Sequence, residues 1–92
     1  MADVDISKLS FLVIDDEPFM LKLVTRLLEE FGAKTILSAE NGAEGLEVLK
    51  ASHGNIDLVI CDLEMPTMNG FDFVRNLRPS PDILNPQVPV LI

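Results

Sequence analysis

The sequence has no tryptophan or tyrosine, and among its 92 residues it has a single cysteine and a single histidine. One cysteine, Cys61, excludes an internal disulfide, which is consistent with a reducing compartment. Basic residues are also scarce. Seven Lys and Arg stand against fifteen Asp and Glu, for a formal net charge of -8. This balance argues against direct binding of nucleic acid and suits cations and basic protein surfaces instead.

Long hydrophobic runs are missing as well. The apolar runs are too short to cross a bilayer, so we expect no membrane contact. Residues 1–8 lack a basic region followed by a long apolar stretch, so we expect no signal peptide and predict a cytoplasmic protein. A hydrophobic content of 48% and a length of 92 residues indicate one ordinary globular domain.

The sequence does contain short apolar runs that alternate with helical patterns. Residues 11–14, 34–39, 56–61 and 88–92 predict four strands, the first and third of them buried. Between the strands, apolar residues recur at helical spacing and predict three helices, which begin near residues 18, 42 and 70. The first helix carries one apolar stripe: Met20, Leu23, Val24, Leu27, Leu28 and Phe31. The third is marked by Phe71, Val74 and Leu77.

The order of these elements is β-α-β-α-β-α-β, which predicts an α/β fold built from parallel β-α-β units with right-handed crossovers. Three prolines in residues 78–87 predict a loop before the fourth strand. Residues 1–8 are polar, and we expect them to form a loose segment that precedes a domain over residues 9–92.

Acidic residues follow two of the predicted strands. Asp15 and Asp16 come after the first strand, and Asp62 after the third. In an open parallel sheet, ligands bind beyond the carboxyl ends of the strands, so these carboxylates converge if the two strands are neighbours. Close carboxylates repel one another, and Mg2+ is the hard cation that best offsets this repulsion. A carboxylate beside it can attack a phosphoryl group and form an aspartyl phosphate.

A single acid at a strand end is more often a solvated turn residue than a site. Two acidic groups at matching strand ends favour a functional site. The other candidates have plainer interpretations. Cys61 lies in a buried strand, where we expect an inert thiol, and His53 lies in a surface turn.

Two motifs resemble the receiver domain of two-component response regulators: Val13-Ile14-Asp15-Asp16-Glu17-Pro18, and Asp62-x-x-Met65-Pro66-x-Met68-x-Gly70. The residues Asn41-Gly42-x-Glu44-Gly45-Leu46 also resemble the entry to the second helix of that family. The resemblance covers residues 9–92. It implies a flavodoxin-like, doubly wound parallel sheet with strand order 2-1-3-4, part of the family order 2-1-3-4-5.

The resemblance also implies a role for each matching residue. Asp62 would be the phosphoacceptor, taking a phosphoryl group from the phosphohistidine of a sensor histidine kinase or a histidine phosphotransfer protein. Asp15, Asp16, Asp62 and the backbone carbonyl of Glu64 would hold Mg2+. The Glu64 side chain would lie at the mouth of the pocket and influence the lifetime of the phosphoryl group. Such a domain phosphorylates and dephosphorylates itself and turns over no outside substrate, so it is a signalling domain rather than an enzyme.

The sequence departs from the family pattern at its end. It stops within the predicted fourth strand, so the hydroxyl residue and the lysine that the family carries after its fourth and fifth strands are absent. We therefore expect a truncated receiver whose open sheet edge favours a homodimer or domain-swapped oligomer. Two alternatives remain: a receiver fragment or interaction module that is never phosphorylated, and an aspartyl-nucleophile phosphatase. Phosphatases of the haloacid-dehalogenase type need an Asp-x-Asp pair after the first strand, whereas Asp15 and Asp16 are adjacent.

Overall fold

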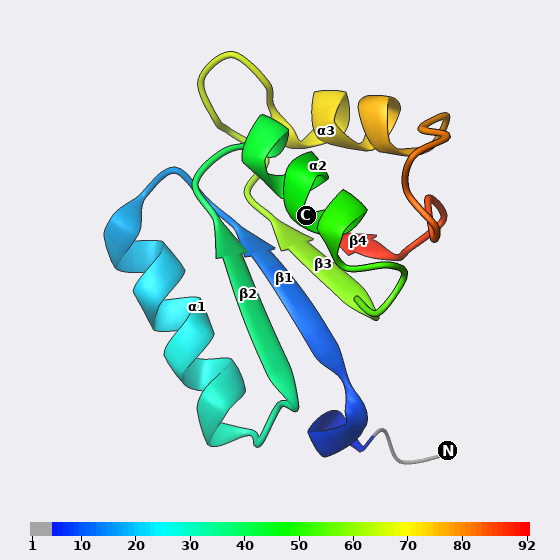
Figure 1. The fold of residues 1–92 in the computed structure, drawn as a ribbon. Helices are drawn as coiled ribbons and strands as arrows, with labels where there is room; N and C mark the ends of the chain where they lie inside the picture. The colour runs from blue at the N-terminus through cyan, green and yellow to red at the C-terminus, as the bar shows by residue number, and fades with distance from the viewer. Residues whose placement is uncertain (1–4) are drawn as a thin grey trace.

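The computed structural model describes residues 5–92 and shows a four-stranded parallel sheet in the order β2-β1-β3-β4 (Figure 1). This is the flavodoxin-like α/β arrangement that the sequence predicts. The sheet is formed by β1 (Ser10–Ile14), β2 (Thr35–Ala39), β3 (Leu58–Cys61) and β4 (Val90–Leu91). The connecting helices are α1 (Pro18–Glu30), α2 (Gly42–Ala51) and α3 (Gly70–Leu77).

The main core lies between one face of the sheet and the helices α2 and α3. Leu12 and Ile14 of β1 pack there with Leu49 of α2 and with Phe73 and Leu77 of α3. Side chains alternate along a strand, so the intervening residues of β1 face the opposite side of the sheet, where α1 contacts β1 and β2. All five residues of β1 are buried, as predicted for a central strand covered on both faces.

The observed strands β3 and β4 are shorter than the predicted ones. Pairing in β3 begins at Leu58 rather than at residue 56, and β4 is limited to Val90 and Leu91. Pro89 lacks an N–H, yet its carbonyl oxygen still accepts a 2.9 Å hydrogen bond from the N–H of Val59. The proline-rich segment before β4 is a loop, as predicted. It is held by the Arg78 guanidinium, which donates to the carbonyl oxygens of Pro86 and Val88.

Two helical faces differ from the prediction. In α3 the buried residues are Gly70, Phe73 and Leu77, and Phe71 is 57% exposed. The predicted apolar stripe of α1 is covered only in part. Its residues Val24 and Leu28 are half-buried, but no residue of α1 is fully buried. The other four residues of the stripe are exposed: Met20, Leu23, Leu27 and Phe31.

The segment that we expected to be loose contains a short 3-10 turn over Ile6–Lys8. The Asp5 side chain caps this turn by accepting a 3.1 Å hydrogen bond from the N–H of Ser7. The remaining residues of the predicted loose segment, 1–4, lie outside the described residues. Across residues 5–92, none of the helices combines the length and the apolar character needed to cross a membrane.

Candidate functional site: an acidic cluster at the carboxyl ends of β1 and β3

The three predicted site aspartates lie together because β1 and β3 are direct neighbours. In the register of the two strands Ile14 lies opposite Cys61, so the next residue of each chain segment leaves the sheet at the same edge. The N–H of Asp62 donates a 2.9 Å hydrogen bond to the carbonyl oxygen of Ile14, and the N–H of Asp15 donates a 3.1 Å hydrogen bond to that of Ala39. These bonds extend the ladder by one residue and fix the backbone from which the carboxylates project.

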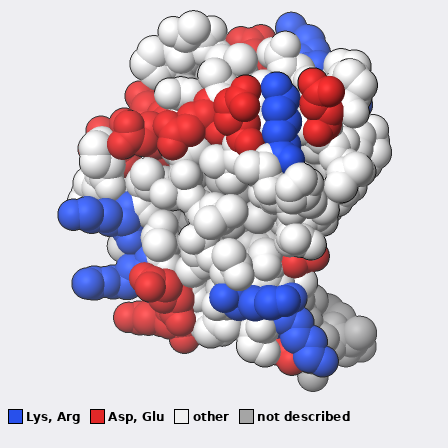
Figure 2. Space-filling model, in the orientation of Figure 1, with Lys and Arg blue, Asp and Glu red and all other residues white. Residues whose placement is uncertain are grey.

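Asp15, Asp16 and Asp62 each place a carboxylate oxygen within 4.8 Å of the other two. Asp15 and Asp62 are half-buried, and Asp16 is exposed. Figure 2 shows that acidic side chains form a band across the upper part of the molecule, at the carboxyl ends of the strands.

The environment of Asp15 raises the pKa of its carboxyl above the ordinary value of 3.8. Burial is the largest cause, and repulsion by the Asp62 and Asp16 carboxylates adds to it. A 2.9 Å hydrogen bond from the N–H of Glu17 to Oδ1 of Asp15 acts in the opposite direction. The ionised cluster is thus electrostatically unfavourable by itself, and a bound cation would relieve the repulsion.

The donor set fits Mg2+. All three side chains offer hard oxygen ligands, which Mg2+ prefers, and their mutual separation allows them to share one ion. Only Asp16 is exposed, so a bound ion would face solvent on one side and could keep water or phosphate oxygens as further ligands.

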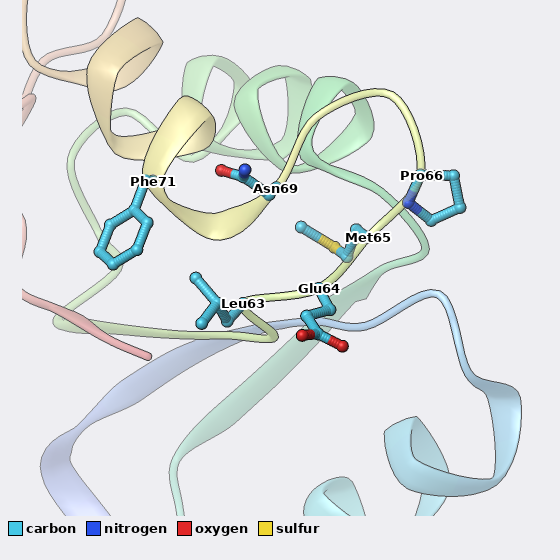
Figure 3. Close-up of a pocket in the computed structure, with 6 residues that line it drawn as sticks. All are labelled: Leu63, Glu64, Met65, Pro66, Asn69 and Phe71. Atoms are coloured by element: carbon cyan, nitrogen blue, oxygen red, sulfur yellow. The ribbon is translucent and has the colours of Figure 1, made fainter.

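Glu64 lies two residues after Asp62, in the loop that joins β3 to α3, and it is exposed. Its side chain lines a shallow hollow on this loop (Figure 3). Glu64 is thus close to Asp62 in sequence, but its carboxylate is not one of the three that converge. The role of its backbone carbonyl as a ligand stays a prediction.

The loop after Asp62 is closed by the start of α3. The N–H of Gly70 donates a 2.8 Å hydrogen bond to the carbonyl oxygen of Leu63. A Cβ atom at Gly70 would lie 3.1 Å from both the carbonyl oxygen of Asp62 and the Cα atom of Leu63, so only glycine allows this approach without a shift of the backbone. Asn69 caps α3 in a reciprocal capping box with Asp72.

A tight turn at Thr67 shapes the middle of the same loop. The N–H of Met68 donates a 2.7 Å hydrogen bond to the carbonyl oxygen of Pro66, which makes a three-residue γ-turn with Thr67 at its centre. The φ angle of Thr67 is 71°, which is rare for a β-branched residue. The turn directs Met68 onto the first turn of α2, where a Cβ atom at Gly42 would meet its sulfur.

Sequence reasoning located the three aspartates but missed two features of the loop that follows Asp62: the capping box at the start of α3 and the γ-turn at Thr67. The sequence predicts a helix that begins near residue 70, but Asn69 was not identified as its cap. The signal was present: Asn69 is followed three residues later by Asp72, a spacing typical of a helix start. The strain at Thr67 had no signal, because threonine does not favour positive φ.

The two plainer candidates lie outside the cluster. Cys61 is 2% exposed, and burial raises the pKa of its thiol to about 11, with smaller contributions from Asp62 and Asp15. The thiol is therefore protonated and shielded at neutral pH, as expected for an inert core cysteine. His53 is exposed in the turn after α2, with a φ angle of 52°.

This fold and this placement of acids are those of one family. Residues 11–92 match the family model of the response regulator receiver domain, so the chain belongs to that family. It is a receiver domain of two-component signalling.

Several relatives are similar to it. A curated relative is the autoinducer 1 sensor kinase/phosphatase LuxN of Vibrio campbellii, 38% identical over 87% of this chain. A receiver domain structure from Clostridium thermocellum has a TM-score of 0.78 and 34% identity over 89% of this chain. The CheX–CheY–BeF3–Mg2+ complex from Borrelia burgdorferi has a TM-score of 0.72 and 31% identity over 77%. The chain spans 9% of the LuxN sequence and 61% and 53% of the two solved chains.

Proposed function

We propose that Asp62 accepts a phosphoryl group from a phosphohistidine. The observation that carries this proposal is the convergence of Asp15, Asp16 and Asp62 at one end of two neighbouring strands. An isolated carboxylate at a strand end would have no means of attracting a phosphoryl group. Three carboxylates that share space need a cation, and a cation attracts phosphate oxygens.

In the proposed transfer, a carboxylate oxygen of Asp62 attacks phosphorus. A new O–P bond forms while the P–N bond to the donor imidazole breaks, and the departing imidazole nitrogen takes a proton from solvent. Asp62 is suited to this role because its backbone is fixed by the bond to Ile14 and by the close approach of Gly70. A fixed nucleophile lowers the entropic part of the barrier.

We assign the metal-binding role to Asp15, Asp16 and Asp62, with the backbone carbonyl of Glu64 as the further ligand. When bound, Mg2+ would neutralise negative charge on the phosphoryl group as it is transferred. The Borrelia relative named above is a complex that contains Mg2+ and BeF3. Asp15 and Asp16 would keep two carboxylates available to hold such an ion after Asp62 has become an acyl phosphate.

The proposed partner is a sensor histidine kinase or a histidine phosphotransfer protein. The proposed location is the cytoplasm. The proposed domain covers residues 9–92. The domain catalyses only its own phosphorylation by the donor and its own dephosphorylation. Within residues 5–92 the outer edge of β4 has no strand partner, and this edge, together with Leu91, which is 58% exposed, supports self-association into a dimer.

The direct test is the intact mass of the chain after incubation with Mg2+ and acetyl phosphate. We expect a gain of one phosphoryl group in the wild-type chain and none in Asp62→Ala. Asp82→Ala is a matched control, because this exposed acid lies in the loop before β4, outside the cluster, and should leave labelling unchanged. No gain in the wild-type chain would support a receiver module that never carries phosphate.

A further inference from the structure

The sheet has a second edge, formed by β2, on the side opposite to β4. Within residues 5–92, β2 pairs only with β1, so its outward N–H and C=O groups have no strand partner. Exposed edges are usually blocked by charged residues or by proline. The five residues of β2, Thr35–Ala39, include neither, and Leu37 is 38% exposed. This edge is therefore open to pairing with a further strand.

A hollow lies on each side of this edge. The first, of about 620 Å³, is lined by residues of α1 and by Ser38 of β2. The second, of about 590 Å³, is lined by Thr35 and Leu37. Side chains of a strand alternate between the two faces of the sheet, so the two hollows lie on opposite faces. An added strand would send successive side chains to alternate hollows, which is how strand addition discriminates between sequences.

Basic side chains line both hollows. Lys22 and Arg26 of α1 line the first, and Lys8 and Lys34 line the second. All four are exposed, and within residues 5–92 none of them has an ion-pair partner. In Figure 2, basic side chains project from the left side, where Figure 1 places α1, and from the lower end of the molecule. Four of the seven basic residues thus flank β2, in a chain with a net charge of -8.

Each hollow also contains one acidic residue, Glu29 in the first and Asp57 in the second. Oδ2 of Asp57 accepts a 2.7 Å hydrogen bond from the N–H of Ser10, which ties this carboxylate to the backbone of β1. Glu29 lies near the end of α1 and is exposed. Two positive groups against one negative group leave each hollow with an excess of positive charge. A fitting strand therefore brings acidic side chains.

These charges disfavour a second copy of the chain as the added strand. Pairing of β2 with β2 would bring the same basic residues of two chains together, and like charges on neighbouring strands repel. The β4 strand of a second copy is limited to Val90 and Leu91 and brings no acidic side chain. An extended segment with acidic residues satisfies both the open backbone and the basic rims.

We propose that β2 binds an extended, acidic segment of a partner protein as an additional strand of the sheet. Backbone hydrogen bonds to the outer edge of β2 supply affinity, and two neighbouring acidic side chains of the partner supply specificity. One of them contacts Lys22 or Arg26 on the first face, and the other contacts Lys34 on the opposite face. This inference goes beyond the proposed function, because it uses no residue of the acidic cluster and requires neither Mg2+ nor a phosphoryl group.

The test uses a fluorescein-labelled peptide, Thr-Val-Thr-Glu-Glu-Val-Thr-Val, whose adjacent glutamates point to opposite faces when it is extended. The wild-type chain is titrated into it in EDTA, and fluorescence anisotropy gives the Kd. One control peptide has lysine at both glutamate positions, and a second keeps the glutamates but is N-methylated at its central residues. We expect the Kd of each control to be about tenfold higher, because one lacks the charge match and the other lacks backbone donors.

Variants of the chain locate the bound peptide. Arg26→Glu and Lys34→Glu each reverse one charge, at the first and the second hollow. Each should raise the Kd by about fivefold at low salt, and the effect should shrink as salt is added. Arg75→Glu makes the same change on α3 and should leave the Kd unchanged. Amide hydrogen exchange should slow at the outward amides of β2 on binding, and exchange at Val90 and Leu91 should stay the same.

The possible contrary results are distinct from one another. No binding of the acidic peptide, or equal binding of its N-methylated form, would show that β2 accepts no strand. An equal loss in Arg75→Glu would show that the net charge of the chain governs binding. Protection at Val90 and Leu91 in place of β2 would assign the peptide to the other edge of the sheet. Each of these results overturns the proposal, whereas labelling of Asp62 by acetyl phosphate tests the proposed function separately.

Discussion

The N–H of Asp62 donates a 2.9 Å hydrogen bond to the carbonyl oxygen of Ile14, the last residue of β1. The proposed acceptor is thus tied to the strand that carries the other two aspartates. A shift of β3 relative to β1 by one residue would break this bond and turn the Asp62 side chain toward the other face of the sheet. The strand register therefore determines whether the three carboxylates can act on one ion.

Mg2+ should stabilise the chain through these carboxylates. At about ten times its Kd, the ion should add about 1.4 kcal/mol to the free energy of unfolding. For a domain of this size, that gain corresponds to a rise of roughly 6–11 °C in the Tm. Thermal unfolding with Mg2+ or with EDTA measures the effect. Asp16→Asn should abolish most of the rise, and Asp82→Asn, in the exposed loop before β4, should preserve it. A rise that survives Asp16→Asn would place the ion elsewhere.

Replacement of Asp15 by Asn should stabilise the metal-free chain at neutral pH. The pKa of Asp15 is raised in the folded chain by burial and by its acidic neighbours, so its ionised form opposes folding. Asn keeps the oxygen that accepts from the N–H of Glu17. We expect a gain of about 0.5 kcal/mol, the size of an interaction between exposed charges.

The sign of the pH dependence follows from the same shift. The penalty is fully present above the folded pKa of Asp15, and it disappears as the pH falls below 3.8, where the carboxyl is protonated in both states. Urea unfolding in EDTA at several pH values between about 7 and 4 should therefore show the gain of Asp15→Asn shrinking with acid. A gain that grows on acidification contradicts the assignment. With saturating Mg2+ the same substitution should destabilise the chain, because it removes a ligand.

The γ-turn at Thr67 offers a site for stabilisation. Its φ angle of 71° is unfavourable for a β-branched residue, whereas Asn tolerates this region. Thr67→Asn should raise the free energy of unfolding by about 1 kcal/mol, the lower end of the range for strained backbone positions. Urea unfolding measures this change. Thr35→Asn is the matched control and should be destabilising, because Thr35 lies in β2, where Asn is disfavoured. If both substitutions destabilise equally, Thr67 is not strained.

The elements of this fold and the three aspartates could be predicted from the sequence because both depend on local patterns. Apolar runs bounded by acids or glycine indicate buried strands, and Asp15, Asp16 and Asp62 follow such runs directly. The orientation of the helices could not be predicted in the same way. In α1 the apolar arc is wide enough to face two directions, and periodicity alone does not say that Leu23 and Leu27 lie outside the contact with the sheet.

The same limit explains Phe71. Both Phe71 and Phe73 lie within one turn of α3, and either could serve as the core residue on hydrophobicity alone. In the structure Phe73 is buried together with Gly70, which approaches Asp62 and Leu63 closely, and with Leu77. The spacing of Phe73 and Leu77, four residues apart, places them on one face of the helix and was the better guide to the buried side.

The open edge of β4 should make the chain self-associate. Within residues 5–92, β4 pairs only with β3, so its outer N–H and C=O groups lack strand partners. Leu91 of β4 and the following Ile92 are 58% and 48% exposed. Charged residues on an exposed edge oppose strand pairing between chains. Sedimentation velocity at about 100 μM should therefore show dimers or larger species for the wild-type chain and mainly monomer for Leu91→Lys.

Leu84→Lys adds the same charge at a residue that is 72% exposed in the loop before β4, and it should leave association unchanged. A wild-type chain that stays monomeric at this concentration would show that the edge is protected in solution. Association that is equally lost in both variants would point to net charge, rather than strand pairing, as the cause.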